Sequence, residues 1–245
     1  MTKLLTANFK YPLGNILRRN FKLSSVDTHQ KYRIALVHPE SYETALAFMK
    51  NHFSDDPLSE AMGASKTKDF ANLVEYMWFE DLRKGLSLQA LSTETNKMVG
   101  LAINAVSNET ENLKRFKEFS EVSNSQPTKN LIKAWEELIH LSVLMPSVQR
   151  PETVFELSGV AVSNDHRGMG IAKKLLLQFL FMAKCHGFKI AKIDCTNEFS
   201  ALAAKSIGFQ CIYEKPFELF KGVKKVKEPH THVRVLVKPL DGFLF

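Results

Sequence analysis

The chain has 245 residues, of which 44% are hydrophobic and 24% are charged, and its formal net charge at pH 7 is +7. This composition is that of an ordinary globular protein that buries a sizeable core. Because no run of 18 apolar residues occurs and the first 15 residues lack the apolar segment of a signal peptide, we expect no membrane span and a cytoplasmic location.

The three cysteines argue against disulfides and against a metal centre. Cys185, Cys195 and Cys211 are odd in number and form no C-x-x-C pair, so we expect small core residues in a reducing compartment. The positive net charge would attract a polyanion. The basic residues are dispersed, and the one basic run, residues 221–230, has no interleaved aromatic residue, which indicates a solvated loop and no nucleic-acid partner.

The first part of the chain predicts an arm, a strand and a helix. Residues 1–30 carry five basic side chains against the single acid Asp27 and show no clear periodicity. We therefore predict a basic N-terminal arm, followed by a single domain over residues 31–245. Residues 31–37 have the pattern of a strand, and apolar residues then recur at helical spacing from Tyr42 to Phe53, which predicts a helix packed on a sheet.

Two adjacent carboxylates, Asp55 and Asp56, precede Pro57 directly after this helix. Proline disfavours a helical residue before it and starts the next element, so the turn is well defined. The pair is either a solvated turn with a helix cap or a functional carboxylate held in a fixed place. A second amphipathic helix is predicted over residues 68–84.

The middle of the chain predicts a hairpin, an insertion and a helix. Residues 87–92 and 98–104 have the pattern of two strands joined by a polar turn. The stretch 105–130 is charged and is interrupted by a polar break at residues 123–127, so we expect an inserted helical segment or mobile loop. Apolar spacing from Leu131 onwards then indicates an amphipathic helix.

An apolar strand, Val154–Val162, leads through a polar turn into a long apolar helix that ends at Gly187. Gly168, Gly170 and Ala172 at this turn let a ligand approach the backbone without meeting large side chains. The first N–H groups of a helix have no partner within it and lie at the positive end of its dipole, so the turn is a candidate phosphate site. A tight turn that needs glycine for steric reasons alone is the alternative.

The spacing of the turn excludes two common phosphate sites. The dinucleotide fingerprint needs a third glycine where Lys173 stands, and the segment lacks the Gly-Lys-Ser/Thr of a P-loop. The remaining pattern, Arg-x-x-Gly-x-Ala at Arg167, Gly170 and Ala172, follows a Val-Ala-Val strand and resembles the acyl-CoA signature of the GCN5-related N-acetyltransferases (GNATs). The resemblance implies a CoA site made of Val160, Ala161, Val162, Arg167, Gly168, Met169, Gly170, Ile171 and Ala172. In it, the loop amides hold the pyrophosphate and the strand pairs with the pantetheine arm.

The rest of the chain predicts a mixed α/β fold. We expect a strand over residues 189–195, a short helix over residues 197–207 and strands over residues 210–217 and 232–237. This order places a parallel pair of strands on either side of the central helix. The GNAT resemblance implies about six to seven strands, helices on both faces of the sheet and a V-shaped splay at the central strands.

Within the GNATs, the chain resembles the insect-type arylalkylamine N-acetyltransferases. Those enzymes carry Phe-x-x-Glu-Pro-Leu after the first helix, where this chain has FSDDPL from Phe53, and a hydroxyl-x-x-x-Ser pair that Thr196 and Ser200 match. The resemblance implies that Asp56 is the general base, usually acting through water, and that Thr196 and Ser200 serve the leaving thiolate. It also places Asn197 beside the CoA thiol.

Two departures from the family pattern concern the acid–base groups. Asp56 is one methylene shorter than glutamate, so it needs a closer acceptor or a bridging water. Ala204 stands where many relatives elsewhere in the superfamily have a tyrosine acid, so any acid is Ser200, Thr196 or water.

These residues predict an N-acetyltransferase that moves an acetyl group from acetyl-CoA to a small primary amine by direct attack in a ternary complex. The amine is an arylalkylamine or polyamine-like, and a peptide or protein amine or a non-catalytic acyl-CoA-binding module are the alternatives. Burial and the neighbouring Asp55 would raise the pKa of Asp56 and suit it to accept a proton. Backbone N–H groups at residues 160–162 would stabilise the oxyanion.

Aromatic residues near the first two helices are candidates for a wall of the acceptor pocket: Phe53, Tyr76, Trp78 and Phe79. His230 and His232 are too few to hold a metal ion, and we expect no metal. One of them, or His166 near a phosphate, is an alternative ligand contact.

Overall fold

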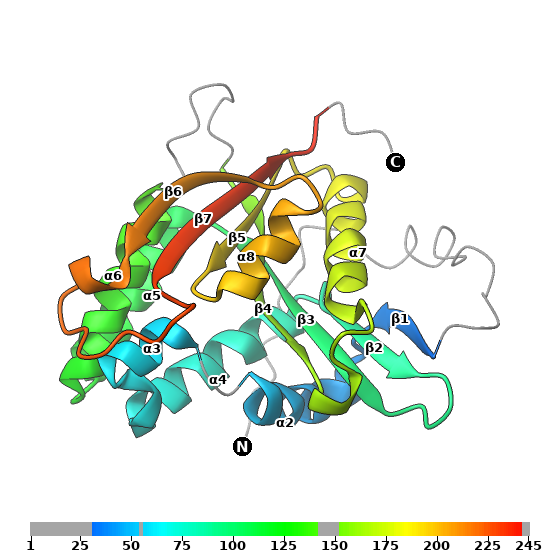
Figure 1. Ribbon diagram of the computed structural model, residues 1–245, viewed down its shortest axis with the longest axis horizontal. Coiled ribbons are helices and arrows are strands. Elements are labelled where there is room, and N and C mark those ends of the chain that lie inside the picture. The colour runs from blue at the N-terminus through cyan, green and yellow to red at the C-terminus, as the bar shows by residue number, and fades with distance from the viewer. Residues whose placement is uncertain (1–30, 54–55, 142–151, 242–245) are drawn as a thin grey trace, which may run out of the picture. The chain divides into compact units, whose positions relative to one another are not determined.

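The computed structural model describes residues 31–53, 56–141 and 152–241. They form a seven-stranded mixed sheet with the strand order β1-β2-β3-β4-β5-β7-β6 (Figure 1). The mixed α/β class and the predicted number of strands are confirmed. The arm predicted at residues 1–30 lies outside the described part. Within that part, no helix is both long enough and apolar enough to cross a bilayer.

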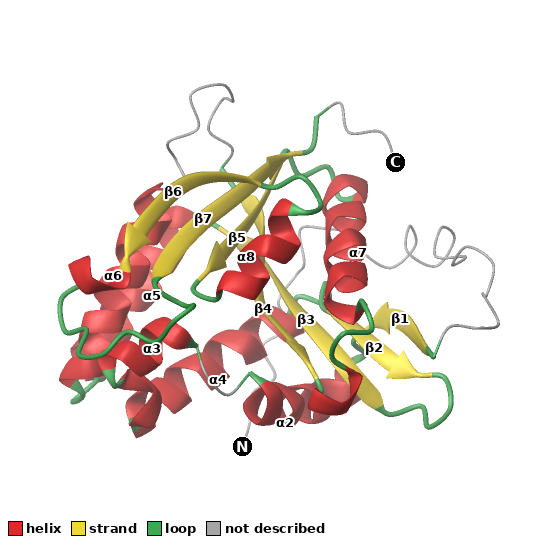
Figure 2. Cartoon of the chain, viewed as in Figure 1, coloured by secondary structure: helices red, strands yellow, loops and turns green. Residues whose placement is uncertain are grey.

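Figure 2 distinguishes the helices from the strands by colour. The strands are β1 (Tyr32–Leu36), β2 (Leu88–Ser92), β3 (Met98–Ser107), β4 (Val154–Val162), β5 (Ile190–Cys195), β6 (Gln210–Pro216) and β7 (His232–Pro239). The helices are α2 (Tyr42–His52), α3 (Pro57–Met62), α4 (Lys68–Arg83), α5 (Glu109–Val122), α6 (Gln126–Leu141), α7 (Ile171–Cys185) and α8 (Glu198–Lys205).

The helices cover both faces of the sheet. On β3, Leu101 and Ile103 pack against α2 and α4, whereas a side chain at Gly100 would meet Ile171 and Leu175 of α7. Because successive residues of a strand point to opposite faces, α2 and α4 lie on one face and α7 lies on the other.

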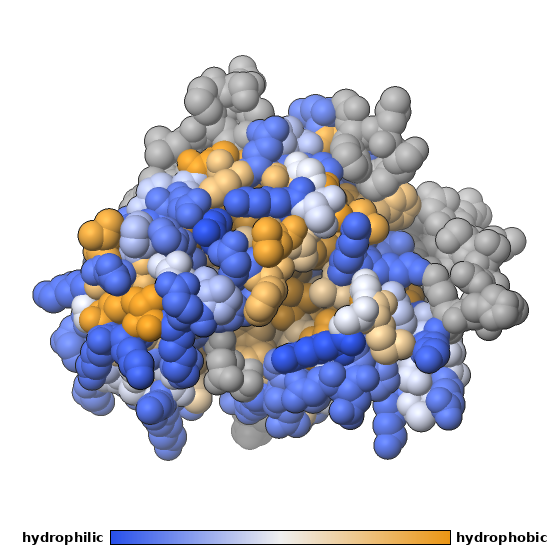
Figure 3. Space-filling view, viewed as in Figure 1, coloured by the Kyte–Doolittle hydropathy of each residue, from blue (hydrophilic) through white to orange (hydrophobic). Residues whose placement is uncertain are grey.

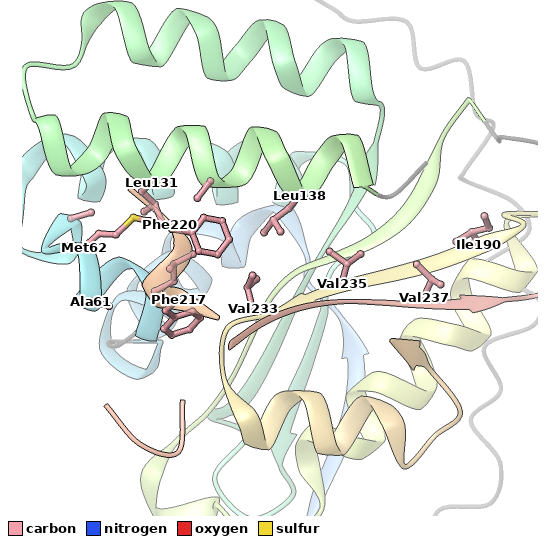
Figure 4. Close-up of a cluster of buried hydrophobic side chains, with 13 residues drawn as sticks. Ala61, Met62, Leu131, Leu138, Ile190, Phe217, Phe220, Val233, Val235 and Val237 are labelled. Carbon is pink, nitrogen blue, oxygen red and sulfur yellow. The ribbon is translucent and has the colours of Figure 1, made fainter. Parts of the chain in front are cut away.

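A second core cluster fixes α3 and α6 against the strands near the carboxyl end of the chain. Alternate residues of β7, Val233, Val235 and Val237, pack with Leu131 and Leu138 of α6 and with the apolar residues of α3 (Figure 4). Fully burying an aliphatic side chain contributes about 1.5–3 kcal/mol. The amino end of α3 is therefore held in place by a core that involves several elements.

A bulge in β4 changes the face of the sheet to which its alternate residues point. Ile103 pairs with Gly159 and Asn104 pairs with Leu157, so Ser158 has no partner on β3. Before the bulge, Phe155 stacks on Phe179 of α7 with 4.8 Å between ring centroids. After it, Gly159 lies under α2 and α4, where an added Cβ would approach Met49 Cε to 2.9 Å. The bulge thus turns this strand toward the α2 and α4 side, as bulges near functional sites often do.

The sheet opens between β4 and β5. These two strands pair in parallel only from Phe155 to Leu157 with Ala191 to Ile193. Residues 159–162 pair with β3 on one side, and the last residues of β5 pair with β7. The predicted V-shaped splay is confirmed, and within the described part of the chain it leaves the other backbone edge of residues 158–162 without a strand partner.

The stretch expected as an insertion consists largely of helix. Strand β3 runs to Ser107, α5 covers residues 109–122, and α6 begins at Gln126 rather than near residue 131. Pro127 is compatible with α6 because the first turn of a helix needs no N–H donor there. The polar break between α5 and α6 is tied to α4, since Asp69 Oδ2 accepts hydrogen bonds from the backbone N–H groups of Asn124 and Ser125 at 2.8 and 2.9 Å.

The expectation that all three cysteines are core residues is wrong for two of them. Cys195 is buried, but Cys185 and Cys211 are exposed. Cys185 is the last residue of α7, and Cys211 lies on β6, the last strand in the sheet order, whose residues are exposed or only partly buried.

Candidate active site

Asp56 is held rigidly at the amino end of α3. It is the N-cap residue, and its Oδ2 accepts a hydrogen bond of 2.7 Å from the backbone N–H of Ser59. Pro57 occupies the first helical position, where its fixed φ suits the helix. The cap geometry leaves the other carboxylate oxygen, Oδ1, free to serve a different group.

That second oxygen meets Thr196, which follows β5. The Thr196 hydroxyl donates a short hydrogen bond to Asp56 Oδ1 across a sequence separation of 140 residues. Burial raises the pKa of Asp56, and the hydrogen bonds from Thr196 and Ser59 oppose this rise. The structure therefore brings two of the predicted catalytic residues into contact, while Asp55 lies outside the described residues.

Asp56 and Thr196 line a pocket with a volume of about 180 Å³, which we call the Asp56 pocket. Its walls carry aromatic side chains from α4, α5 and α6 and from the end of α2: Phe53, Phe70, Trp78, Phe116 and Trp135. Phe53 and Trp78 meet edge to face, with 5.2 Å between their centroids. On the face of the molecule shown in Figure 3, apolar surface is visible at the bottom of a hollow with polar rims.

Two of the four residues expected in an aromatic wall lie elsewhere. Phe53 and Trp78 are part of the Asp56 pocket, but Tyr76 and Phe79 do not line it, and they are 46% and 38% exposed. They lie on the part of α4 that faces outward toward α2. The helical period places them on a different side of α4 from Trp78.

Asp81 lies on another wall of the pocket and is buried. Burial raises the pKa of Asp81, against hydrogen bonds from Lys84 and from Ser158 at the bulge of β4. Lys84 Nζ lies 3.1 Å from Asp81 Oδ1 and also donates to the carbonyl oxygen of Val106. The contacts of Asp81 with Ser158 thus connect α4 to the bulge of β4.

A buried ion triad forms the wall along β4 and β5. Lys192 Nζ lies 3.1 Å from Glu156 Oε1 and 2.8 Å from Asp194 Oδ2. Burial alone would lower the pKa of Lys192, but the two carboxylates outweigh it and raise this pKa. Burial raises the pKa of Asp194, with Lys192 opposing the rise. Glu156 and Asp194 line the Asp56 pocket.

The 167–172 turn has the geometry of an anion site. Gly168 and Gly170 adopt φ values of 78° and 75°, which residues with side chains rarely adopt. A Cβ added at either glycine would meet nothing within 4 Å, so open space lies beside the backbone. Gly170 is the N-cap of α7 and provides no capping side chain, which leaves the first N–H groups of this helix available to a ligand.

Arg167 and His166 fold back onto the turn. The backbone N–H of Arg167 donates to the carbonyl oxygen of Asn164, and its Nε lies 3.4 Å from the carbonyl oxygen of Val162. His166 Nδ1 lies 2.8 Å from Ser163 Oγ. These contacts shape the turn, and a direct contact of Arg167 with CoA stays a prediction.

The other two residues predicted near the thioester lie at the amino end of α8. Asn197 is the N-cap, and its Oδ1 accepts hydrogen bonds from the N–H groups of Phe199 and Ser200 at 2.9 and 3.4 Å. Ser200 belongs to the first turn and does not line the Asp56 pocket. The roles predicted for Asn197 and Ser200 stay predictions.

The two histidines near the start of β7 have local partners. His230 Nδ1 accepts a hydrogen bond of 3.1 Å from the backbone N–H of Glu198, and His232 Nδ1 lies 2.7 Å from Thr231 Oγ1. Among the described residues, no group of three or more His, Cys, Asp or Glu side chains is arranged to hold a metal ion. His230 thus supports the amino end of α8.

The sequence did not reveal three residues that line the pocket, Asp81, Glu156 and Asp194, or two residues beside it, Gly159 and Lys192. Lys192 and Asp194 gave one usable signal, because two charged residues alternate in an otherwise apolar strand and therefore point to the same face. For Asp81 and Gly159, no local pattern indicates the role.

One family model and several solved structures are similar to this chain. The model of the Acetyltransferase (GNAT) family matches residues 136–209. The fold is similar to that of arylalkylamine N-acetyltransferase 2 from Aedes aegypti, with a TM-score of 0.75 and 22% identity over 86% of this chain and 100% of that chain.

Two further structures have the same architecture. Mosquito arylalkylamine N-acetyltransferase like 5b gives a TM-score of 0.72 and 18% identity over 85% of this chain and 100% of that chain. A Drosophila melanogaster polyamine N-acetyltransferase that forms N-acetylagmatine gives a TM-score of 0.68 and 15% identity over 85% of this chain and 100% of that chain. At these identities the likeness concerns the fold, which is the open mixed sheet with helices on both faces.

Proposed function

We propose, from the premise that this chain is an acyltransferase with a GNAT acetyltransferase domain, that it transfers an acetyl group from acetyl-CoA to a small primary amine. The observation that carries this proposal is the contact between Asp56 and Thr196 inside an aromatic pocket. Structurally similar proteins are named for arylalkylamines and for a polyamine reaction that forms N-acetylagmatine. Both are small amines, which supports the same class of acceptor here.

Two features of the backbone support acetyl-CoA as the acyl donor. The open backbone of the 167–172 turn fits a pyrophosphate, and the free edge of residues 158–162 fits an extended arm that hydrogen-bonds along a strand. Acetyl-CoA supplies the reactive thioester. The backbone N–H groups of residues 160–162 are candidates to stabilise negative charge on its carbonyl oxygen.

Asp56 is the proposed general base. A primary amine is protonated at neutral pH and must lose a proton before it can attack a carbonyl carbon. Asp56 accepts that proton, directly or through a water, because its carboxylate lines the pocket and its pKa is raised toward the useful range. Thr196 holds the carboxylate by its hydroxyl. Together with Ser200 it is also proposed to serve the leaving thiolate, and Asn197 is proposed to lie beside the CoA thiol.

The size of the pocket favours a small acceptor over a protein. A volume of about 180 Å³ is below the roughly 300–1,000 Å³ of sites for drug-sized ligands. The aromatic walls suit an apolar or aromatic body of the amine, and carboxylates at the walls suit its charged group. A peptide amine is the second candidate, and the structure offers no particular observation that favours it.

The pH dependence of the reaction provides a first prediction. Asp56 must be ionised to act as a base, and burial raises its pKa above that of an ordinary aspartate. The acid limb of the kcat/KM profile is therefore expected at a pH above the ordinary carboxyl range, with activity lost as pH falls through the raised pKa. Steady-state rates measured from pH 4 to 9, with the amine pKa taken into account, check this. An acid limb at or below the ordinary aspartate pKa would contradict the prediction.

The proposed function is tested by the release of free thiol from acetyl-CoA across a panel of acceptors. The panel holds arylalkylamines, aliphatic diamines, a guanidinoalkylamine and a peptide with a free amino terminus. We expect turnover with small amines and little with the peptide. Turnover with the peptide alone would show that the acceptor is a peptide amine and not a small amine. Tight acetyl-CoA binding without turnover on any acceptor would overturn the proposal.

A further inference from the structure

We infer that Asp194 recognises a second hydrogen-bond donor at the far end of the acceptor amine. Preferred acceptors then carry an ammonium, guanidinium or hydroxyl group opposite the amine that is acetylated. This inference rests on the proposed function and assigns the residue that selects among small amines.

The spacing of two residues at the end of β5 sets the distance between the two ends of the acceptor. Asp194 and Thr196 are two residues apart, and both line the Asp56 pocket. Two residues of extended chain span about 6.6 Å. An amine placed at Asp56 and Thr196 therefore has a distal group about 6–7 Å away at Asp194, a span that four to five bonded atoms or one aromatic ring can cover.

The ion triad leaves negative charge at this end of the pocket. One lysine, Lys192, serves two carboxylates, Glu156 and Asp194, so one negative charge is not balanced within the triad. Two cationic side chains line the pocket itself, Lys84 and Arg115, and both interact with Asp81. A donor on the ligand, and a cationic one above all, would complete the charge balance at Asp194.

One oxygen of Asp194 also lacks a partner. Oδ2 accepts from Lys192, whereas Oδ1 is buried and has no hydrogen-bond partner among the described residues. A buried acceptor without a partner is costly, and the large majority of such atoms in native proteins are paired. The other carboxylate wall of the pocket, Asp81, already has Lys84 and Ser158 as partners.

The test uses two matched pairs of acceptors that differ only in the distal donor. Tyramine is compared with phenethylamine, and putrescine is compared with butylamine, by kcat/KM for thiol release. The wild-type protein is expected to prefer the donor-bearing member of at least one pair by about five- to tenfold. The tyramine pair measures the effect of a neutral hydroxyl donor, and the putrescine pair measures the effect of a cationic donor. The two kinds of donor are therefore tested separately.

Two variants assign the preference to a residue. Asp194→Asn is expected to remove most of the preference while turnover of phenethylamine and butylamine continues. Glu156→Gln removes the other carboxylate from the same lysine and keeps Asp194 with its unpartnered Oδ1, so it serves as the matched control. Both variants leave the triad without excess charge, so any part of the preference that comes from net charge alone is lost equally in both. Glu156→Gln should therefore retain more of the preference than Asp194→Asn does. Acetyl-CoA affinity, measured by calorimetry, shows that both variants are folded.

Several outcomes would overturn the inference. One is a wild-type protein that does not discriminate within either pair, and this result needs no variant. Others are retention of the preference in Asp194→Asn, or its equal loss in both variants, which would assign it to the net negative charge of the triad. Absence of turnover with all four amines would instead overturn the proposed function, and with it this inference.

Discussion

Replacing Asp56 with asparagine is expected to lower kcat/KM for the acceptor amine by about 10²–10⁴-fold, the usual contribution of a general base. The affinity for acetyl-CoA should change little, because the 167–172 turn is separate from α3 in the chain and in its contacts. Asparagine is as good an N-cap as aspartate. Its side-chain oxygen can accept from Ser59, and its amide can donate to the Thr196 hydroxyl, so the contacts of Asp56 have counterparts in the variant.

The rate loss has to be separated from a loss of stability. Asn108→Ala provides the control, because Asn108 caps α5 through a hydrogen bond to the N–H of Glu111 and does not line the Asp56 pocket. Loss of such a cap costs about 1 kcal/mol of stability and should leave kcat/KM within about twofold of wild type. Thermal unfolding and steady-state rates are measured on both variants. Turnover of Asp56→Asn within a few fold of wild type would remove Asp56 as the base.

The pH profile of Asp56→Asn adds a readout that a structural defect would not produce. If Asp56 is the base, the acid limb assigned to it disappears. The remaining rate then follows the fraction of unprotonated amine in solution. A variant that was only partly unfolded would keep the shape of the wild-type profile at a lower level.

The parts of the site that the sequence predicted are those encoded by contiguous residues. A cap-forming aspartate before a proline, and glycines between a strand and a helix, have local causes that act within about one turn of chain. For this reason Asp56 and the glycines of the 167–172 turn could be found without knowledge of the fold. Pairing Asp56 with Thr196 required the family resemblance, since nothing local connects two residues 140 positions apart.

The parts that were missed depend on packing between distant segments. Phe116 reaches the pocket because the stretch expected as an insertion forms α5, and Trp135 reaches it from the predicted helix α6. The bulge at Ser158 and the close contact of Gly159 with Met49 of α2 are likewise features of the packed structure. Such close approaches follow from the full three-dimensional core, and single-strand patterns do not contain them.

Gly170→Ala is expected to weaken acetyl-CoA binding by about 10- to 100-fold, the effect of losing one or two hydrogen bonds to a charged group. The reason is geometric. Gly170 has a φ of 75°, and the space beside its missing Cβ is open. Alanine disfavours this φ, and its methyl group would project into the space that a phosphate needs. Binding is measured by calorimetry with acetyl-CoA and with CoA.

Gly187→Ala is the matched control for this prediction because it imposes the same backbone strain at the other end of α7. Gly187 has a φ of 76°, and an added Cβ there also meets nothing within 4 Å. Both variants should therefore lose about 1–2 kcal/mol of unfolding free energy, the usual cost of a left-handed residue with a side chain, as measured by urea denaturation. Since only Gly170 lies where the free N–H groups of α7 begin, only Gly170→Ala should lose affinity for the nucleotide. Equal affinities in the two variants would mean that the pyrophosphate is held elsewhere, and the 167–172 turn would then be a turn that needs glycine for steric reasons alone.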